Sequence, residues 1–144
     1  MDKAELREYL LEKRNSLSRE EVLSASETII KEIDALIKKN KSIVLLGFMP
    51  LGNEIDLRAL YKKILAGYYK ENFDIDIILG LPRVCGKEMR FFKIDSLDNL
   101  EKSKFGIMEP RLNSEEIIAK NAHVMVPLIG LDKDKRRLGF GGGF

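Results

Sequence analysis

Hydrophobic residues recur at helical spacing over the first forty positions of the chain. Leu6, Tyr9, Leu10 and Leu17 form a modest stripe that predicts a helix over residues 2–14. Ser18 and Glu21 have the spacing of a capping box, in which each side chain bonds the backbone amide of the other residue. A second helix is therefore predicted over residues 19–39, with these hydrophobic positions: Val22, Ala25, Ile29, Ile33, Leu36 and Ile37.

The pattern changes at Ile43 to short, continuous apolar runs, which are typical of strands buried on both faces. The first run covers residues 43–48 and is ended by Pro50 and Gly52. Helical spacing returns over residues 57–68, and a second run over 75–81 stops at Pro82, which completes a strand–helix–strand unit. The remaining expected elements are an edge strand at 89–93, a short helix at 114–120 and a third buried strand at 123–129.

Strands that alternate with helices predict an α/β fold with three layers, α-β-α, around a mostly parallel, Rossmann-like sheet. We find no internal repeat and no linker, so residues 1–144 are interpreted as a single domain. Ligands of such sheets bind outside the carboxyl ends of the strands. Three segments are expected to meet there, namely residues 49–54, 82–87 and 130–144.

Composition narrows the possible partners. The 144 residues include 25 Lys and Arg against 23 Asp and Glu, a net charge of +2, which is too small to predict a nucleic acid or an anionic membrane as partner. The apolar runs are shorter than the roughly 20 residues of a spanning helix, and the first dozen residues alternate acids and bases rather than forming a signal peptide. With Cys85 as the single cysteine, these features predict a cytoplasmic protein.

The glycine-rich ending is the strongest local signal for chemistry. Four of the 11 glycines lie within the last six residues, directly after Arg136, Arg137 and Leu138. Glycines let several backbone N–H groups converge on phosphate oxygens, and an arginine adds charge-assisted hydrogen bonds. The segment matches neither the P-loop nor the dinucleotide pattern, so a phosphate-binding loop and a flexible glycine tail both remain open.

Other candidates also allow two interpretations. Lys3 and Arg7 lie four residues apart on one helical face, where they could clamp a polyphosphate or simply face solvent beside glutamates. Glu54 follows the first strand and could accept hydrogen bonds from an amino-pyrimidine ring, or serve as an acid at a helix entry. Phe48 and Met49 could wall a pocket or pack in the core.

Histidine and cysteine offer little chemistry in this chain. His123 is the single histidine and Cys85 the single cysteine, so together they cannot form a metal cluster. We interpret His123 as a packed or edge residue and Cys85 as a structural thiol. No catalytic nucleophile is therefore predicted.

Several short motifs occur in an order that resembles the 5-formyltetrahydrofolate cyclo-ligase family, also called methenyltetrahydrofolate synthetases. The resemblance covers essentially the whole chain, and its specificity lies in the order and spacing of the pieces. They are Lys3-x-x-Leu6-Arg7, Glu54-Ile55-Asp56, Leu81-Pro82-Arg83, Met89-x-Phe91, Gly106-Ile107-x-Glu109-Pro110, Val126-Pro127-Leu128-Ile129-Gly130-Leu131-Asp132 and Arg137-Leu138-Gly139-x-Gly141-x-Gly143.

The resemblance implies an enzyme that uses ATP and Mg²⁺ to convert 5-formyltetrahydrofolate to 5,10-methenyltetrahydrofolate, with release of ADP and phosphate. It implies a monomer whose partners are these small molecules, and Arg137 as the catalytic residue. Met49, Glu54, Phe140 and Phe144 would line the folate site, and Phe105 stands where the family tends to have an aromatic residue. The implied ATP contacts are Lys3, Arg7, Arg136, Arg137, Leu138, Gly139, Phe140, Gly141, Gly142 and Gly143.

The chain also departs from the family pattern. Family members continue past the glycines with an aspartate that resembles a magnesium ligand and with a further helix and strands, whereas this sequence ends at Phe144. We therefore expect the domain to lack its C-terminal part, and we assign no metal ligand. Two alternatives stay open: a folate- and nucleotide-binding protein with impaired catalysis, and a nucleic-acid contact through the basic segment 133–137.

Overall fold

Two capped helices open the chain. The structure, a computed structural model, describes residues 2–139. Helix α1 (Lys3–Asn15) begins with a capping box between Asp2 and Glu5, and α2 (Arg19–Lys38) begins with the predicted box between Ser18 and Glu21. Both predicted helices are confirmed. Their caps stabilise them by bonding amides that have no partner within the first turn.

A mostly parallel sheet follows, with the order β3-β2-β1-β6. Strands β1 (Ser42–Leu46) and β2 (Asp76–Cys85) pair in parallel, and β1 also pairs in parallel with β6 (His123–Val124). Strand β3 (Glu88–Lys93) pairs with β2 in antiparallel fashion at the other edge. The α/β class, the parallel sheet and the edge strand are as expected.

The crossover from β1 to β2 contains two helices rather than one. Residues 57–68 were expected to form one helix, but α3 (Arg58–Leu65) ends before Gly67, and α4 (Tyr68–Phe73) follows it. Gly67 has a φ of 84°, which a helix cannot accommodate and which glycine adopts without a steric penalty. The helical spacing of the apolar residues continues through this break, so the pattern alone did not locate it.

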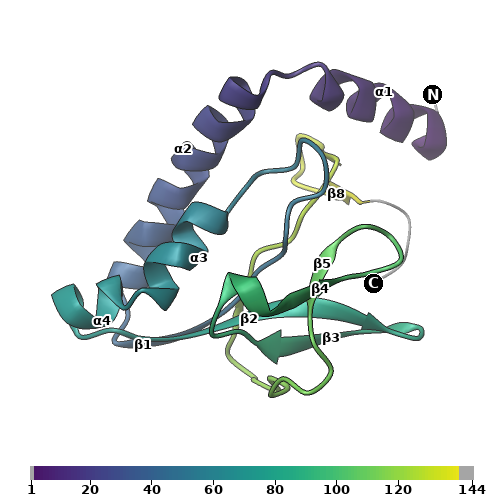
Figure 1. Cartoon of the computed structure of the whole chain (residues 1–144). Coiled ribbons are helices and arrows are strands. Elements are labelled where there is room, and N and C mark those ends of the chain that lie inside the picture. Colours follow the sequence, from purple (N-terminus) through teal and green to yellow (C-terminus); the bar gives the residue numbers. More distant parts are fainter. Residues whose placement is uncertain (1, 140–144) are drawn as a thin grey trace.

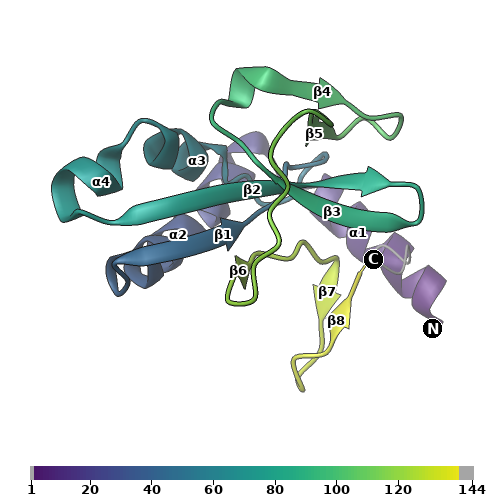
Figure 2. The same cartoon turned by 90° about the horizontal axis from the view of Figure 1, so that it is seen from below.

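Helices α2, α3 and α4 lie over one face of the sheet (Figure 1), and the view from below shows the strands in front of them (Figure 2). The core lies between these two layers and includes Leu45, Leu60 and Tyr61, each with no exposed surface. On the opposite face Ile78 and Val124 are 42% and 51% exposed. The second helical layer of the three-layer prediction stays a prediction.

Strand β2 continues through Pro82, although the proline was expected to end it. Pro82 pairs with Phe91 of β3 beyond Gly80, the last residue of β2 that pairs with β1. Two residues later the Val84 N–H points away from β3 and bonds the Glu109 carboxylate at 3.0 Å. Backbone N–H groups alternate between the two edges of a strand, so the nitrogen of Pro82 faces the same edge as that of Val84, away from β3. Strand β1 no longer pairs with β2 at this position, so the absence of an N–H on Pro82 breaks no hydrogen bond between strands.

The helix expected at 114–120 is wrong. This segment runs extended beside β3: Lys93 N donates to Glu115 O at 2.7 Å, and Ile117 N donates to Phe91 O at 2.8 Å. Arg90 and Glu116 add a two-pronged ion pair across the two segments, with N–O distances of 2.8 and 2.5 Å. These partners on β3 are distant in sequence, so the local apolar spacing was misleading.

The third buried strand is also shorter and more exposed than predicted for 123–129. Strand β6 covers two residues, both exposed, and Met125 N extends its pairing with Leu46 O at 2.8 Å. Pro127, which lacks an N–H, lies just beyond the strand. Two small antiparallel pairs were not predicted: β4 (Leu100–Lys102) with β5 (Met108–Pro110), and β7 (Gly130–Leu131) with β8 (Arg137–Leu138).

Candidate active site

The loop that follows β1 carries two of the predicted substrate residues. Gly47 N still bonds Gly80 O of β2 at 2.9 Å, and the chain then leaves the sheet through Phe48 and Met49. Met49 is buried in the core cluster, so its side chain packs against the interior, as one of its two interpretations expected. A tight turn from Leu51 brings the chain back at Glu54, which is 6% exposed.

Glu54 combines burial with an unused hydrogen-bonding atom. Its Oε1 accepts from Leu51 N at 2.7 Å, whereas its buried Oε2 has no hydrogen-bond partner within residues 2–139. Burial raises the pKa of the carboxyl above its ordinary value, and the Leu51 hydrogen bond and the nearby Arg14 charge oppose the increase. A buried acceptor without a partner costs free energy, so Glu54 fits a ligand that donates a hydrogen bond to Oε2.

Asn53 ties this loop to the end of α1. Its Nδ2 donates to the carbonyls of Arg14 and Leu17 at 2.8 and 3.0 Å. The Arg14 carbonyl lies in the last turn of α1, where backbone acceptors lack the usual partner four residues later, and the Leu17 carbonyl lies just beyond the helix. Sequence reasoning missed this role of Asn53, because neither partner is near it in the chain.

The other half of α1 lies against the beginning of the glycine-rich segment. Arg7 Nε donates to Gly139 O at 2.9 Å across 132 positions of sequence. Gly130 of β7 lies so close to Leu10 that an added Cβ would come within 2.6 Å of the leucine Cδ1 atom. Figures 1 and 2 accordingly show the β7–β8 hairpin beside α1. The structure thus brings Arg7 and Gly139, two of the predicted ATP contacts, together.

The three remaining predicted cations differ in their surroundings. Arg136 is bound by Asp132 and Asp134 at 2.9 and 3.2 Å, and its side chain is 77% exposed. Arg137 begins β8 and is exposed, and Lys3 is exposed in the first turn of α1. Within the described part of the chain, the side chains of Lys3 and Arg137 form no ion pair or hydrogen bond, which leaves both charges available for an anion.

The glycine-rich segment is described only at its beginning. Leu138 is half-buried, and its carbonyl accepts from the N–H of Ile129, the residue before β7, at 2.8 Å, which fixes the start of the segment beside β7. Five predicted contacts lie outside the described residues: Phe140, Gly141, Gly142, Gly143 and Phe144.

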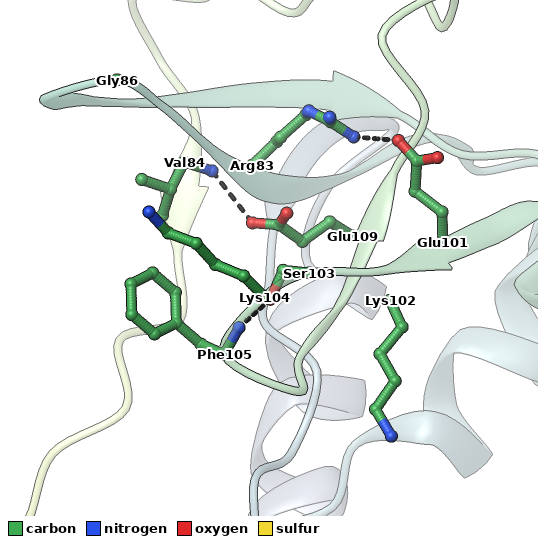
Figure 3. Close-up of a pocket in the computed structure, with 9 residues that line it drawn as sticks. All are labelled: Arg83, Val84, Gly86, Glu101, Lys102, Ser103, Lys104, Phe105 and Glu109. Atoms are coloured by element: carbon green, nitrogen blue, oxygen red, sulfur yellow. Dashed lines mark hydrogen bonds and ion pairs between the residues drawn. The ribbon is translucent and has the colours of Figure 1, made fainter.

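A separate cavity of about 430 Å³ lies where the β2–β3 hairpin meets β4 and β5. Arg83 points to Glu101, while the Glu109 carboxylate accepts from Val84 N (Figure 3). Arg83 also donates to Pro110 O at 2.9 Å. Phe105 is 63% exposed at this cavity. Residues 82–87, expected as a loop at the ligand edge, form part of this hairpin. Of the cavity residues, Arg83, Phe105 and Glu109 were noted from the sequence through the family resemblance, but no site was predicted here.

The described residues do not by themselves form a magnesium site. Within residues 2–139, no three His, Cys, Asp or Glu side chains lie close enough together to hold a metal ion. Asp132 and Asp134, the acids nearest the glycine-rich segment in sequence, are engaged by Arg136. In phosphate-transfer sites Mg²⁺ is bound by substrate phosphates, by waters and by one or two carboxylates.

Comparison with known proteins decides the family. The model of the 5-formyltetrahydrofolate cyclo-ligase family matches residues 1–144. The chain belongs to the 5-formyltetrahydrofolate cyclo-ligase family. The solved structure of 5,10-methenyltetrahydrofolate synthetase from Aquifex aeolicus is similar to this family member, with a TM-score of 0.78, 35% identity and coverage of 98% of this chain and 68% of that chain.

Two further relatives agree with this assignment. The 5,10-methenyltetrahydrofolate synthetase of Mycoplasma pneumoniae superposes with a TM-score of 0.68 at 25% identity, covering 100% of this chain and 74% of the other. The 5-formyltetrahydrofolate cyclo-ligase of Haemophilus influenzae is 40% identical over 47 residues, which are 31% of this chain and 25% of that protein. This cyclo-ligase family member therefore spans only part of each relative's length.

None of its helices within residues 2–139 is long and apolar enough to cross a membrane.

Proposed function

We propose that this protein converts 5-formyltetrahydrofolate to 5,10-methenyltetrahydrofolate in a reaction that consumes ATP and releases ADP and phosphate. Family membership supports this activity. The observation that carries the proposal is the bond from Arg7 Nε to Gly139 O, which joins a cationic helix to the start of a glycine-rich segment. We propose further that the protein acts as a cytoplasmic monomer on these small molecules, without a nucleic acid or membrane partner.

The phosphate side of the site is built from cations on two elements. Arg7 donates from Nε to Gly139 O, and its two Nη groups have no hydrogen-bond partner within residues 2–139. Both Nη groups can therefore bond phosphate oxygens. Lys3 lies one turn before Arg7 on α1, and Arg137 lies two residues before Gly139. Guanidinium groups bind phosphate through paired hydrogen bonds, so Arg7 and Arg137 would orient the ATP phosphates. Arg136 would serve there only by leaving its two aspartates, which makes it the weakest candidate.

The folate side of the site depends on Glu54. The unpartnered Oε2 would accept a hydrogen bond from a ring N–H or amino group of the folate, while Oε1 stays on Leu51 N. Glu54 Oε2 has already lost its water in the free protein. A hydrogen bond from the folate therefore adds binding free energy without a further desolvation cost at this atom. Met49 would pack beside the ring as part of the adjacent core.

The proposed reaction needs no protein nucleophile. The γ-phosphoryl group passes from ATP to the formyl oxygen of the folate, and ADP leaves. The folate N10 then attacks the activated formyl carbon, the C–O bond breaks to release phosphate, and N10 loses its proton to phosphate or water as the ring closes. Mg²⁺ bound to ATP would neutralise phosphate charge, and Arg137, as the catalytic residue, would stabilise charge on the transferring group.

Arg137→Ala tests the phosphate assignment, with Lys133→Ala as a control that removes another exposed cation from the same hairpin. Losing a charge-assisted bond costs about 1.5–3 kcal/mol, so the Kd for a non-hydrolysable ATP analogue should rise at least tenfold. Methenyltetrahydrofolate formation should be lost, while the control keeps both properties. Unchanged affinity and rate in Arg137→Ala would refute the assignment. Binding of both substrates to the wild-type protein without ADP release would instead indicate the alternative, a binding protein without turnover.

A further inference from the structure

One buried hydroxyl holds both polar backbone groups of Phe48, the residue at which the chain leaves the sheet. Tyr61 Oη on α3 donates to Phe48 O at 2.7 Å and accepts from Phe48 N at 3.0 Å. Tyr61 has no exposed surface, and burial raises the pKa of its phenol above its ordinary value, so the hydroxyl keeps its proton. Neither backbone group of Phe48 has a strand partner, because β1 ends at Leu46 and the sheet pairing at Gly47.

The backbone before Phe48 is shaped to admit this hydroxyl. A Cβ placed on Gly47 would lie 2.2 Å from Tyr61 Oη and 2.9 Å from its Cζ, closer than side-chain contacts occur. Glycine is therefore required at this position for the phenol to reach the backbone. The three residues together form one unit, which we call the Tyr61 anchor: Gly47, Phe48 and Tyr61.

The Tyr61 anchor fixes the direction in which the substrate loop departs. The accepting carbonyl of Phe48 belongs to the peptide that joins it to Met49, so the bond sets the plane of that peptide. Met49 is followed by the Leu51–Glu54 turn, which holds the Glu54 carboxylate. A small rotation of the Phe48–Met49 peptide would move the whole turn, and productive binding sites tolerate displacements of only about 0.5 Å.

We infer that Tyr61 is a positioning residue for the folate site, acting through the Phe48–Met49 peptide on Met49 and Glu54. The inference rests on the proposed function, because Met49 and Glu54 are assigned to folate there. Tyr61 itself cannot touch a ligand, because it is fully buried under the sheet. Its hydroxyl sets the geometry of the loop, and the loop makes the contacts.

Tyr61→Phe removes the hydroxyl and keeps the ring. Tyr69→Phe is the matched control, because Tyr69 is 1% exposed, lies in the same helical layer and donates its hydroxyl to Asp34 Oδ1 on α2 at 2.7 Å. Both variants lose stability by losing a buried bond. Only Tyr61→Phe should weaken binding of 5-formyltetrahydrofolate, by about tenfold in Kd, while the affinity for an ATP analogue stays within about twofold. Equal folate affinity in Tyr61→Phe and Tyr69→Phe overturns the inference, since the hydroxyl would then serve stability alone.

The backbone amide spectrum of the free protein provides a second test that needs no folate. Tyr61→Phe should shift the amide resonances of Met49, Leu51 and Glu54, whereas Tyr69→Phe should leave all three in place. Shifts limited to Phe48 would overturn the inference. A wild-type protein that fails to bind folate contradicts the proposed function, and the amide shifts still decide whether Tyr61 orients the loop.

A third measurement applies if Tyr61→Phe does not fold. Replacing all four tyrosines by 3-fluorotyrosine keeps every hydroxyl and places a fluorine on each ring. Addition of 5-formyltetrahydrofolate should then move the fluorine resonance of residue 61 and leave that of residue 69 unchanged. A resonance of residue 61 that does not respond to bound folate contradicts the inference.

Discussion

Replacing Glu54 by glutamine changes one buried atom of the proposed folate site and little else. Glu54→Gln keeps the side-chain shape and the oxygen that accepts from Leu51 N at 2.7 Å. At the second position it exchanges the unpartnered Oε2, an acceptor, for an NH₂ group, which donates. A folate N–H that bonds the carboxylate would then face another donor.

The size of the effect follows from the loss of one charge-assisted hydrogen bond. Such bonds contribute about 1.5–3 kcal/mol, so the Kd for 5-formyltetrahydrofolate should rise by about 10- to 150-fold, as measured by calorimetry at pH 7. The affinity for an ATP analogue should not change. Asp34→Asn is the control, because it makes the same acid-to-amide change at a carboxylate that bonds Tyr69 and Lys38 instead. Wild-type folate affinity in Glu54→Gln would refute the assignment.

The same variant predicts a pH dependence of stability. The pKa of Glu54 is raised in the folded protein above its ordinary 4.5, so ionisation of this group opposes folding. The contribution of the protonated Glu54 carboxyl to the free energy of unfolding is complete below pH 4.5 and is lost as the pH rises through the folded-state pKa. Urea unfolding of Glu54→Gln should therefore show stability that improves relative to the wild type between pH 4.5 and pH 8. A difference in unfolding free energy between the two proteins that is constant with pH would show that burial does not raise the pKa of Glu54.

Two further predictions concern other charged groups. Arg7→Ala should weaken binding of an ATP analogue about tenfold or more in calorimetry, because it releases Gly139 O and removes two Nη groups that have no hydrogen-bond partner within residues 2–139; unchanged affinity contradicts the phosphate role. Asp56→Asn should lower the unfolding free energy by about 1.5–3 kcal/mol at pH 7, because the buried Asp56 carboxylate accepts from Arg58 and Arg19 at 2.7 Å each. The arginine hydrogen bonds lower the pKa of Asp56 below its ordinary 3.8, so this difference should shrink as the pH falls below 3.8. A difference that is as large at pH 2 as at pH 7 contradicts that explanation.

The first two helices and the two longest parallel strands could be predicted because their signals are local. The capping box of Ser18 and Glu21 and the apolar run from Ile43 each lie within a few neighbouring residues. Two of the errors arose where distant partners decide the conformation. Ile117 pairs with Phe91, and Pro82 is tolerated because β1 has already separated from β2.

The candidate site shows the same division. Lys3, Arg7 and Glu54 could be singled out by residue type and by their places at predicted element ends. The roles of Asn53 and Tyr61 could not, because each depends on carbonyls or amides brought near by the fold. The four-residue turn that buries Glu54 while leaving Oε2 without a partner is likewise a property of the packed loop.

The central claim is that this chain converts 5-formyltetrahydrofolate to 5,10-methenyltetrahydrofolate in a reaction that consumes ATP. The direct test mixes the purified protein with 5-formyltetrahydrofolate, Mg²⁺ and ATP and follows the absorbance of 5,10-methenyltetrahydrofolate together with ADP release. We predict that the absorbance rises only when the folate and ATP are both present, with one ADP formed per product molecule. No absorbance increase at saturating concentrations of both substrates, with the protein folded, would contradict the claim.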